Sequence, residues 1–183
     1  MSEQAVHSLN VFLGAGAIAL QALSVLALLI LFLGPRKNNL LEFLNRRFLS
    51  IGFFVSLFAV LFSLVYSEII GFAPCHLCWL QRIFMFPMVF LFGVAMWKKD
   101  RGVIKYVFPL LFVGFAVSVY QNFGYYFGEN NTGPCDASGV SCYQHLVSVF
   151  GGYISIPMLA LTAFVALLSI NLVAYFYGKR NNI

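Results

Sequence analysis

The stretch "VFLGAGAIALQALSVLALLILFL" occupies residues 11–33 and contains no charged side chain. Four further apolar runs follow, at residues 48–70, 79–97, 103–124 and 153–177. A membrane-spanning helix needs ~20 predominantly apolar residues, and each of the five runs is long enough. A helix of a soluble protein shows a polar face at helical period, which these runs lack. The sequence therefore predicts an all-α integral membrane protein, a helical bundle with five spans.

The composition supports this class. Of the 183 residues, 61% are hydrophobic and only 9% are charged, whereas a soluble domain is about half apolar and about a quarter charged. Residues 11–33 exceed the roughly 7–15-residue apolar core of a signal peptide, and no Lys or Arg precedes them. We therefore expect this run to be retained as a helix in one compact bundle, since no repeat or linker divides the chain.

The basic residues predict an orientation. If the N-terminus lies outside and the five spans alternate, the C-terminus is cytoplasmic, and ten of the eleven Lys and Arg residues fall on the cytoplasmic side. These ten are Arg36, Lys37, Arg46, Arg47, Lys98, Lys99, Arg101, Lys105, Lys179 and Arg180. The net charge of +5 is then an orientation signal, and we expect no nucleic-acid partner.

All four cysteines fall on the opposite, outer side. Cys75 and Cys78 precede the third apolar run, and Cys135 and Cys142 lie between the fourth and the fifth. Disulfides form and persist outside the cytoplasm, where thiols are not kept reduced. Two close pairs on one face therefore predict a dithiol system in an oxidising compartment.

Two other interpretations of the cysteines stay open. Structural disulfides are less favoured, because a bridge between Cys75 and Cys78 closes a very small loop and removes little chain entropy. A four-cysteine zinc site is also less favoured, because six residues separate Cys135 from Cys142 where two to four are usual. We favour redox exchange and expect no bound metal.

The segment "APCHLCWLQR", residues 73–82, adds a local reason. Trp79 begins an apolar run, so Cys78 lies at or next to a helix N-terminus, where the helix dipole stabilises a thiolate. Arg82 follows four residues after Cys78, on the same helix face and one turn deeper. An arginine at membrane depth indicates function. The alternative is that Arg82 extends to the membrane surface or pairs with Glu68.

Two segments resemble a known family. "YSEIIGFAPCHLCWLQRIFMFP", residues 66–87, resembles the first redox segment of the disulfide bond formation protein B family (DsbB), and most of all its protein C (BdbC-like) subgroup. "CDASGVSCYQHLVSVFGGYISIPMLALTAF", residues 135–164, resembles that subgroup's second cysteine loop and final helix. The resemblance covers roughly residues 50–175.

The resemblance implies a fold and an activity. It implies a four-helix redox domain at residues 48–178, an additional N-terminal span and cytoplasmic loop within residues 1–47, and a cytoplasmic tail at residues 179–183. Family members take electrons from an extracytoplasmic thioredoxin-fold thiol oxidant (DsbA-like) and pass them to a quinone. The resemblance thus implies a thiol:quinone oxidoreductase, embedded in the lipid of the bacterial cytoplasmic membrane, that uses ubiquinone or menaquinone and supports disulfide formation in exported proteins.

Residue roles follow from the same resemblance. Cys135 would form a mixed disulfide with the oxidant, and Cys142 would exchange with Cys75. Cys78 would face the quinone, with Arg82 beside it to stabilise negative charge. The quinone site would also include Trp79 and Gln121.

The chain departs from the family pattern in four places. Residues 11–33 add a span in front of the usual four. Leu80 stands where relatives commonly have Tyr, and Gln121 stands where they often have a quinone-side histidine. Glutamine can donate a hydrogen bond to a carbonyl but cannot titrate near neutral pH. The spacing of Cys135 and Cys142 matches the protein C subgroup and is shorter than in the protein B type.

Two competing functions remain. Relatives of vitamin K epoxide reductase also connect quinones with cysteine pairs, but their membrane-facing CxxC follows the loop cysteines, the reverse of the order here. A non-enzymatic protein, either a membrane subunit with structural disulfides or a metal carrier, is the other possibility. Catalytic cysteines cycle between oxidised and reduced forms, and structural ones do not.

Overall fold

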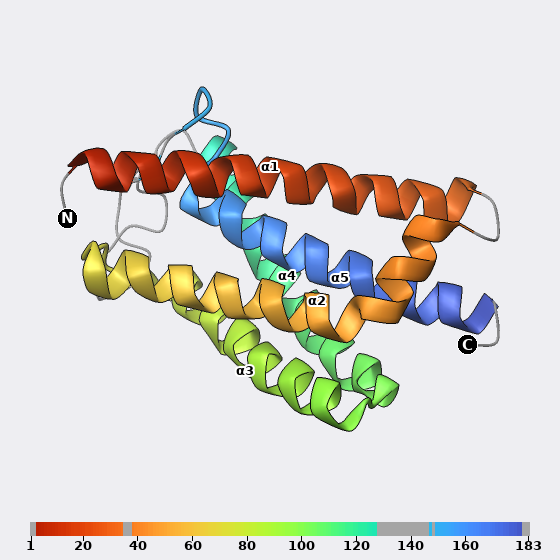
Figure 1. The fold of residues 1–183 in the computed structure, drawn as a ribbon. Coiled ribbons are helices and arrows are strands. Elements are labelled where there is room, and N and C mark those ends of the chain that lie inside the picture. The colour runs from red at the N-terminus through yellow and green to blue at the C-terminus, as the bar shows by residue number, and fades with distance from the viewer. Residues whose placement is uncertain (1–2, 35–37, 128–146, 148, 181–183) are drawn as a thin grey trace.

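The computed structural model describes residues 3–34, 38–127, 147 and 149–180, and helices dominate these residues (Figure 1). The elements are α1 (Glu3–Leu33), α2 (Asn39–Leu64), a π-helical turn η1 (Val65–Ile69), α3 (His76–Lys98), a 3₁₀ turn η2 (Arg101–Val103), α4 (Ile104–Phe127) and α5 (Ile156–Arg180). Five helical segments of the described chain are long and apolar enough to cross a membrane. This confirms the predicted all-α membrane bundle with five spans.

The start of α2 differs from the prediction. The apolar run begins at residue 48, yet the helix begins at Asn39, so residues 39–47 are helix rather than loop. The Asn38 side chain accepts a hydrogen bond from the Leu40 backbone N–H at 2.9 Å and caps the helix. Leu41 is fully buried. Charged residues interrupt the apolar pattern in these first turns, so a search for long apolar runs does not detect this part of the helix.

The bundle core forms where α5 packs against α2 and α4. Phe164 and Leu167 of α5 are almost fully buried in one apolar cluster with Phe92 of α3 and Leu111 of α4. α3 packs in turn against α2 and α4, which completes a four-helix core. This core holds the α3 N-terminus against α2 and α4, where the site described below is found.

Helix α1 lies outside the four-helix core and runs beside α5 (Figure 1). Near one end, Leu31 of α1 packs with Leu41 of α2 and with Val173 and Tyr177 of α5. At mid-length, Gln21 Nε2 donates a hydrogen bond to Thr162 Oγ1 of α5 at 2.6 Å. The additional helix is thus a fixed part of the bundle.

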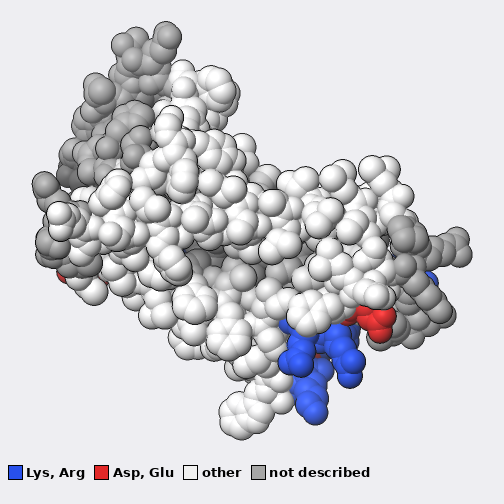
Figure 2. Space-filling model, turned by 45° about the horizontal axis from the view of Figure 1, so that its top comes forward, with Lys and Arg blue, Asp and Glu red and all other residues white. Residues whose placement is uncertain are grey.

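The cluster of Lys and Arg side chains and the first cysteine pair occupy opposite ends of the bundle. Basic side chains cluster at one end, as Figure 2 shows, where α2 and α4 begin and α3 and α5 end. Arg101 there bonds to Asn45 of α2 and lies 4.9 Å from the centroid of the Phe48 ring. The first cysteine pair lies at the start of α3, at the other end (Figure 1). Arg82 is the one basic residue of the described chain away from the charged end.

Candidate functional site

The N-terminus of α3 brings two cysteines together. Cys75 is the N-cap, with an extended backbone, and its Sγ accepts a hydrogen bond from the Cys78 backbone N–H at 3.4 Å. Cys78 lies in the first helical turn, and its Sγ is 2.9 Å from Cys75 Sγ. Pro74 directly precedes the pair, and its fixed φ stiffens the entry to the helix. The two sulfurs are therefore in contact at the helix mouth, with Cys75 rather than Cys78 at the cap position.

The surroundings of Cys75 favour its protonated form. Cys75 is buried, with 3% of its surface exposed. The hydrogen bond to Cys78 and burial raise the pKa of the Cys75 thiol above its ordinary value. A protonated Cys75 can donate to the Cys78 sulfur, 2.9 Å away. Cys78 is thus the sulfur placed to carry negative charge, and it lies at a helix N-terminus, which favours an anion.

Gln121 of α4 reaches both sulfurs. Its Nε2 lies 3.5 Å from Cys75 Sγ and 3.6 Å from Cys78 Sγ, within the distances of N–H···S hydrogen bonds. Its Oε1 accepts a hydrogen bond from Gln81 Nε2 of α3 at 2.8 Å. Both amides are buried. A side chain predicted from the sequence thus touches the cysteine pair, and Gln81 holds it there.

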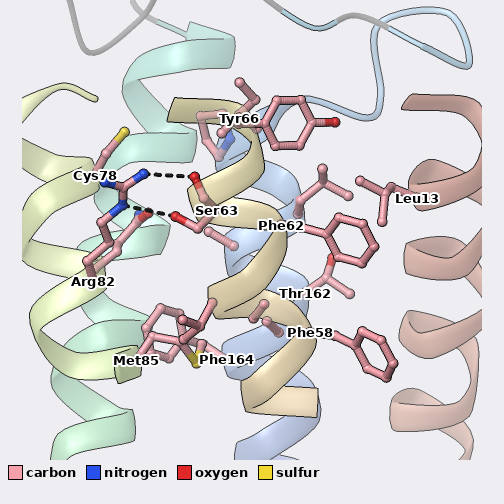
Figure 3. A pocket seen from close by; sticks show the side chains of 18 of the residues that line it. Leu13, Phe58, Phe62, Ser63, Tyr66, Cys78, Arg82, Met85, Thr162 and Phe164 are labelled. Atoms are coloured by element: carbon pink, nitrogen blue, oxygen red, sulfur yellow. Dashed lines mark hydrogen bonds between the residues drawn. The ribbon is translucent and has the colours of Figure 1, made fainter. Parts of the chain in front are cut away.

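Arg82 is buried beside the same pair, with 8% of its surface exposed. Its Nε donates to Ser63 Oγ at 2.9 Å, and its Nη2 donates to the Ser63 carbonyl at 2.8 Å (Figure 3). The π-helical turn of α2 begins two residues after Ser63. Glu68 is exposed and accepts a hydrogen bond from Ser67 instead. Arg82 therefore neither extends to the surface nor pairs with Glu68.

Trp79 is in contact with Arg82. The arginine Cζ is 5.1 Å from the centroid of the indole ring, a cation–π contact. Trp79 is 54% exposed, and it is not among the residues that line the cavity described next. Its contact with the site therefore runs through Arg82, and its place at a quinone site stays a prediction from the sequence.

A cavity of about 430 Å³ opens from the cysteine pair into the bundle. At the thiol end, polar groups line it: Cys75, Cys78, Gln81, Arg82 and Gln121. Away from that end, apolar side chains of α1, α2 and α5 form most of the wall. Figure 3 shows Cys78 and Arg82 on the α3 side of α2, and Leu13, Phe58 and Phe62 on the α1 side. The cavity thus has a polar end at the cysteines and a long apolar extension away from them.

The structure brings together four of the predicted site residues: Cys75, Cys78, Arg82 and Gln121. The second pair, Cys135 and Cys142, lies outside the described residues.

Sequence reasoning missed Ser63, Gln81 and Tyr66, which also line the cavity. The signal available for them was a polar side chain inside an apolar run, which is costly in a membrane and therefore usually paired or functional.

Comparison with known proteins agrees with this geometry. Residues 45–174 match the family model described as Disulfide bond formation protein DsbB. "Disulfide bond formation protein C" of Bacillus subtilis is 41% identical over 122 residues, which are 66% of this chain and 87% of that protein. "Probable disulfide formation protein C 2" of Bacillus anthracis is 38% identical over 120 residues, 66% of this chain and 84% of that protein.

A more distant relative gives the same indication. "Probable disulfide formation protein" of Deinococcus radiodurans is 33% identical over 129 residues, 67% of this chain and 84% of that protein. No solved structure matches the chain. Together with five membrane-length helices and a cysteine pair at a cavity mouth, these matches show that the chain belongs to the DsbB family, in its protein C-like subgroup, and is a disulfide-bond-forming membrane oxidoreductase.

Proposed function

We propose that the protein is a thiol:quinone oxidoreductase that reoxidises an extracytoplasmic thioredoxin-fold oxidant and so supports disulfide formation in exported proteins. The observation that carries this proposal is one cavity that joins the Cys75–Cys78 pair and the buried Arg82 to an apolar interior. A thiol pair that reacts only with soluble proteins has no need of such a cavity. An electron acceptor dissolved in the membrane does.

The cavity fits a quinone. Its volume of about 430 Å³ lies within the range of roughly 300–1,000 Å³ that small-molecule sites occupy. A quinone ring carries two carbonyl oxygens that accept hydrogen bonds, and Arg82 and the two glutamines place donors at the thiol end. The remaining wall is largely apolar, as the hydrocarbon tail of a quinone requires. Ubiquinone and menaquinone both meet this description.

A bound quinone would supply a two-electron, two-proton acceptor at this end of the cavity, so that the Cys75–Cys78 dithiol could become a disulfide. The protein's own groups prepare this exchange. Cys75 retains a proton, and Cys78 carries the developing negative charge. Arg82 supplies a fixed positive charge to the thiol end, and Gln121 donates to both sulfurs. Because the cavity lies inside an apolar bundle, these charges are poorly screened and interact more strongly than in water.

The partner side of the proposal rests on position along the chain. Cys135 would accept the mixed disulfide with the soluble oxidant, and Cys142 would return electrons to Cys75. We place the thiol end outside the bacterial cytoplasmic membrane and the basic end in the cytoplasm. The clustering of Lys and Arg at one end supports this orientation.

The decisive experiment separates the two pairs. Purified protein in detergent is given a quinone together with either a reduced thioredoxin-fold oxidant or dithiothreitol. Replacement of Cys135 by Ala should abolish oxidation of the protein partner yet leave quinone reduction by dithiothreitol. Replacement of Cys78 by Ala should abolish both. If Cys135→Ala oxidises the partner at the normal rate, the proposed route is wrong.

The orientation has its own test. A membrane-impermeant thiol reagent, added to intact cells after reduction, should label Cys135 and Cys142 from outside. Labelling of either residue only after the cytoplasm is opened would contradict the proposed topology. A protein whose cysteines stay oxidised throughout turnover would instead hold structural disulfides.

A further inference from the structure

Helix α1 contributes to the cavity, although it lies outside the part of the chain that the family model matches, residues 45–174. Five of its residues line the cavity: Phe12, Leu13, Gly16, Ala17 and Leu20. All five are apolar and fall within less than three helical turns. This additional helix therefore forms a side wall of the space that reaches the cysteines.

Two polar anchors hold this stretch of α1 in place. On one side of it, Tyr66 of η1 donates its hydroxyl to Asn10 Oδ1 at 2.6 Å, and both residues are buried. On the other side, Gln21 donates to Thr162 at 2.6 Å and accepts from the Tyr153 hydroxyl at 2.9 Å. The cavity-lining residues of α1 lie between Asn10 and Gln21. Hydrogen bonds between helices hold a membrane bundle in a defined arrangement, so α1 is fixed over the cavity.

The part of the cavity beside α1 is suited to an apolar occupant. Figure 3 shows Leu13 facing the rings of Phe58 and Phe62, with Thr162 beside them on α5. The Thr162 hydroxyl is already engaged, because it accepts from Gln21 and donates to the Met158 carbonyl. The space is continuous with the thiol end. A molecule with its ring at Cys78 would therefore extend its hydrocarbon chain towards α1.

We propose that α1 closes the side of the cavity and binds the isoprenoid tail of the quinone, so that this additional helix favours long-tailed over short-tailed acceptors. The inference rests on the proposed function and assigns a role to a helix that the family core lacks. Gly16 is the position at which it can be tested most directly. A Cβ placed on Gly16 meets no atom within 4 Å, so the space beside it is open.

The first experiment replaces Gly16 by Leu, which fills the tail space without disturbing the backbone. Quinone reduction driven by dithiothreitol is measured with a tailless quinone and with the same ring carrying four isoprene units. For the long-tailed quinone, Gly16→Leu should raise KM about tenfold, the effect of an overpacked apolar contact. For the tailless quinone, KM should change less than about twofold, within the scatter of near-neutral substitutions. Ala19→Leu is the matched control, because Ala19 is an exposed residue of α1 outside the cavity lining.

The second experiment needs no variant and no turnover. A quinone with a photoreactive diazirine on its tail is bound to wild-type protein and irradiated, and the labelled residues are found by mass spectrometry. Label should appear on the lining residues Leu13, Gly16, Ala17 and Leu20 of α1, and excess unlabelled long-tailed quinone should remove it. Ordinary membrane lipid carrying the same diazirine should not label these residues above the level seen at Ala19.

The outcomes are distinguishable. Equal effects of Gly16→Leu on both quinones, no effect on either, or label confined to α2 and α5 would each overturn the role of α1. Equal labelling by quinone and lipid would show that α1 faces ordinary lipid, which also overturns it. If wild-type protein reduces no quinone and binds none, the proposed function itself fails.

Discussion

Arg82 of α3 is fixed to Ser63 of α2 by two hydrogen bonds, one to the hydroxyl at 2.9 Å and one to the backbone carbonyl at 2.8 Å. A guanidinium has five N–H donors, so these bonds leave others available towards the cavity. The carbonyl is part of the helix backbone and cannot be lost by mutation of the side chain. The arginine is therefore positioned by a neighbouring helix rather than by its own flexible chain.

Arg82→Ala should slow quinone reduction about ten- to a hundredfold. A hydrogen bond to a charged group contributes roughly 1.5–3 kcal/mol, and each 1.36 kcal/mol of transition-state stabilisation is about tenfold in rate. Arg82→Lys keeps the charge but loses the planar fork, so an intermediate defect is expected. The measurement is the initial rate of quinone reduction with dithiothreitol as donor.

The matched control for this prediction is Lys98→Ala, because Lys98 is an exposed basic residue at the opposite end of the same helix. Its rate should equal that of wild type. If Arg82→Ala reduces quinone at the wild-type rate, the prediction is wrong and Arg82 only connects α2 and α3.

Ser63→Ala should have a smaller effect, about two- to tenfold, because one neutral acceptor is removed while the backbone carbonyl remains. A double-mutant cycle tests whether the serine acts through the arginine. In the Arg82→Ala background, Ser63→Ala should have no further effect on the rate. Additive losses would mean that Ser63 touches the reaction independently of Arg82.

The alkylation of Cys75 should depend on pH in a way that the neighbouring sulfur controls. Only the thiolate reacts, and the pKa of the Cys75 thiol is raised, first by its hydrogen bond to Cys78 and then by burial. At a given pH less thiolate is therefore present than on an ordinary cysteine, so alkylation by iodoacetamide should be slow near neutrality and should rise only in alkali. Cys78→Ala removes the largest cause and should move the rise to lower pH. Mass spectrometry of the reduced protein over a pH series measures this shift, and an unchanged profile in Cys78→Ala would contradict it.

The sequence predicted those parts of the site that depend on spacing along one helix. Cys75, Cys78 and Arg82 lie within two turns of α3, so helical geometry alone places them together. It also predicted the separation of charge, because basic residues flank the spans in a regular order. What could not be predicted are contacts between helices. The bond between Gln81 and Gln121 joins positions 40 residues apart, and nothing in either segment specifies which faces meet.

The position of α1 in the bundle also could not be predicted from the sequence. Its sequence is apolar all round, so no polar face indicates which side is buried. Asn10 and Gln21 were visible as polar residues in or beside an apolar run, but their partners, Tyr66 and Thr162, could be found only from the packed bundle. The role of the helix therefore emerged from the cavity that it lines.

Gly114→Ala should destabilise the bundle, although alanine usually favours a helix. A Cβ at Gly114 would overlap the ring of Phe164, which is almost fully buried between helices. Overpacking costs about 1–3 kcal/mol, more than the gain of up to about 1 kcal/mol in helix propensity. Thermal unfolding in detergent should show a lower midpoint for Gly114→Ala. Gly16→Ala is the control and should not lower it, because the space beside Gly16 is open.

Variants of the two buried glutamines, Gln81 and Gln121, can separate an effect on the reaction rate from an effect on the stability of the bundle. Gln121→Leu removes the donor to both sulfurs and also leaves Gln81 Nε2 without its bond to Gln121. A buried donor without its partner costs about 1–3 kcal/mol, so this variant should be both slower in quinone reduction and less stable. The double variant Gln81→Leu/Gln121→Leu removes the stranded amide as well. Its unfolding midpoint should return towards that of wild type, because two apolar side chains of similar size replace a paired polar group.

Turnover in the double variant should not return. The sulfurs still lack the N–H groups of Gln121, so the rate of quinone reduction should stay about tenfold below wild type, the loss expected for roughly 1.4 kcal/mol. Unfolding midpoints and initial rates measured on the same preparations test both halves. Recovery of the rate together with stability would mean that Gln121 only fills space and holds Gln81. A rate that stays low while stability recovers would show that these amide groups act on the reaction itself and not only on the stability of the bundle.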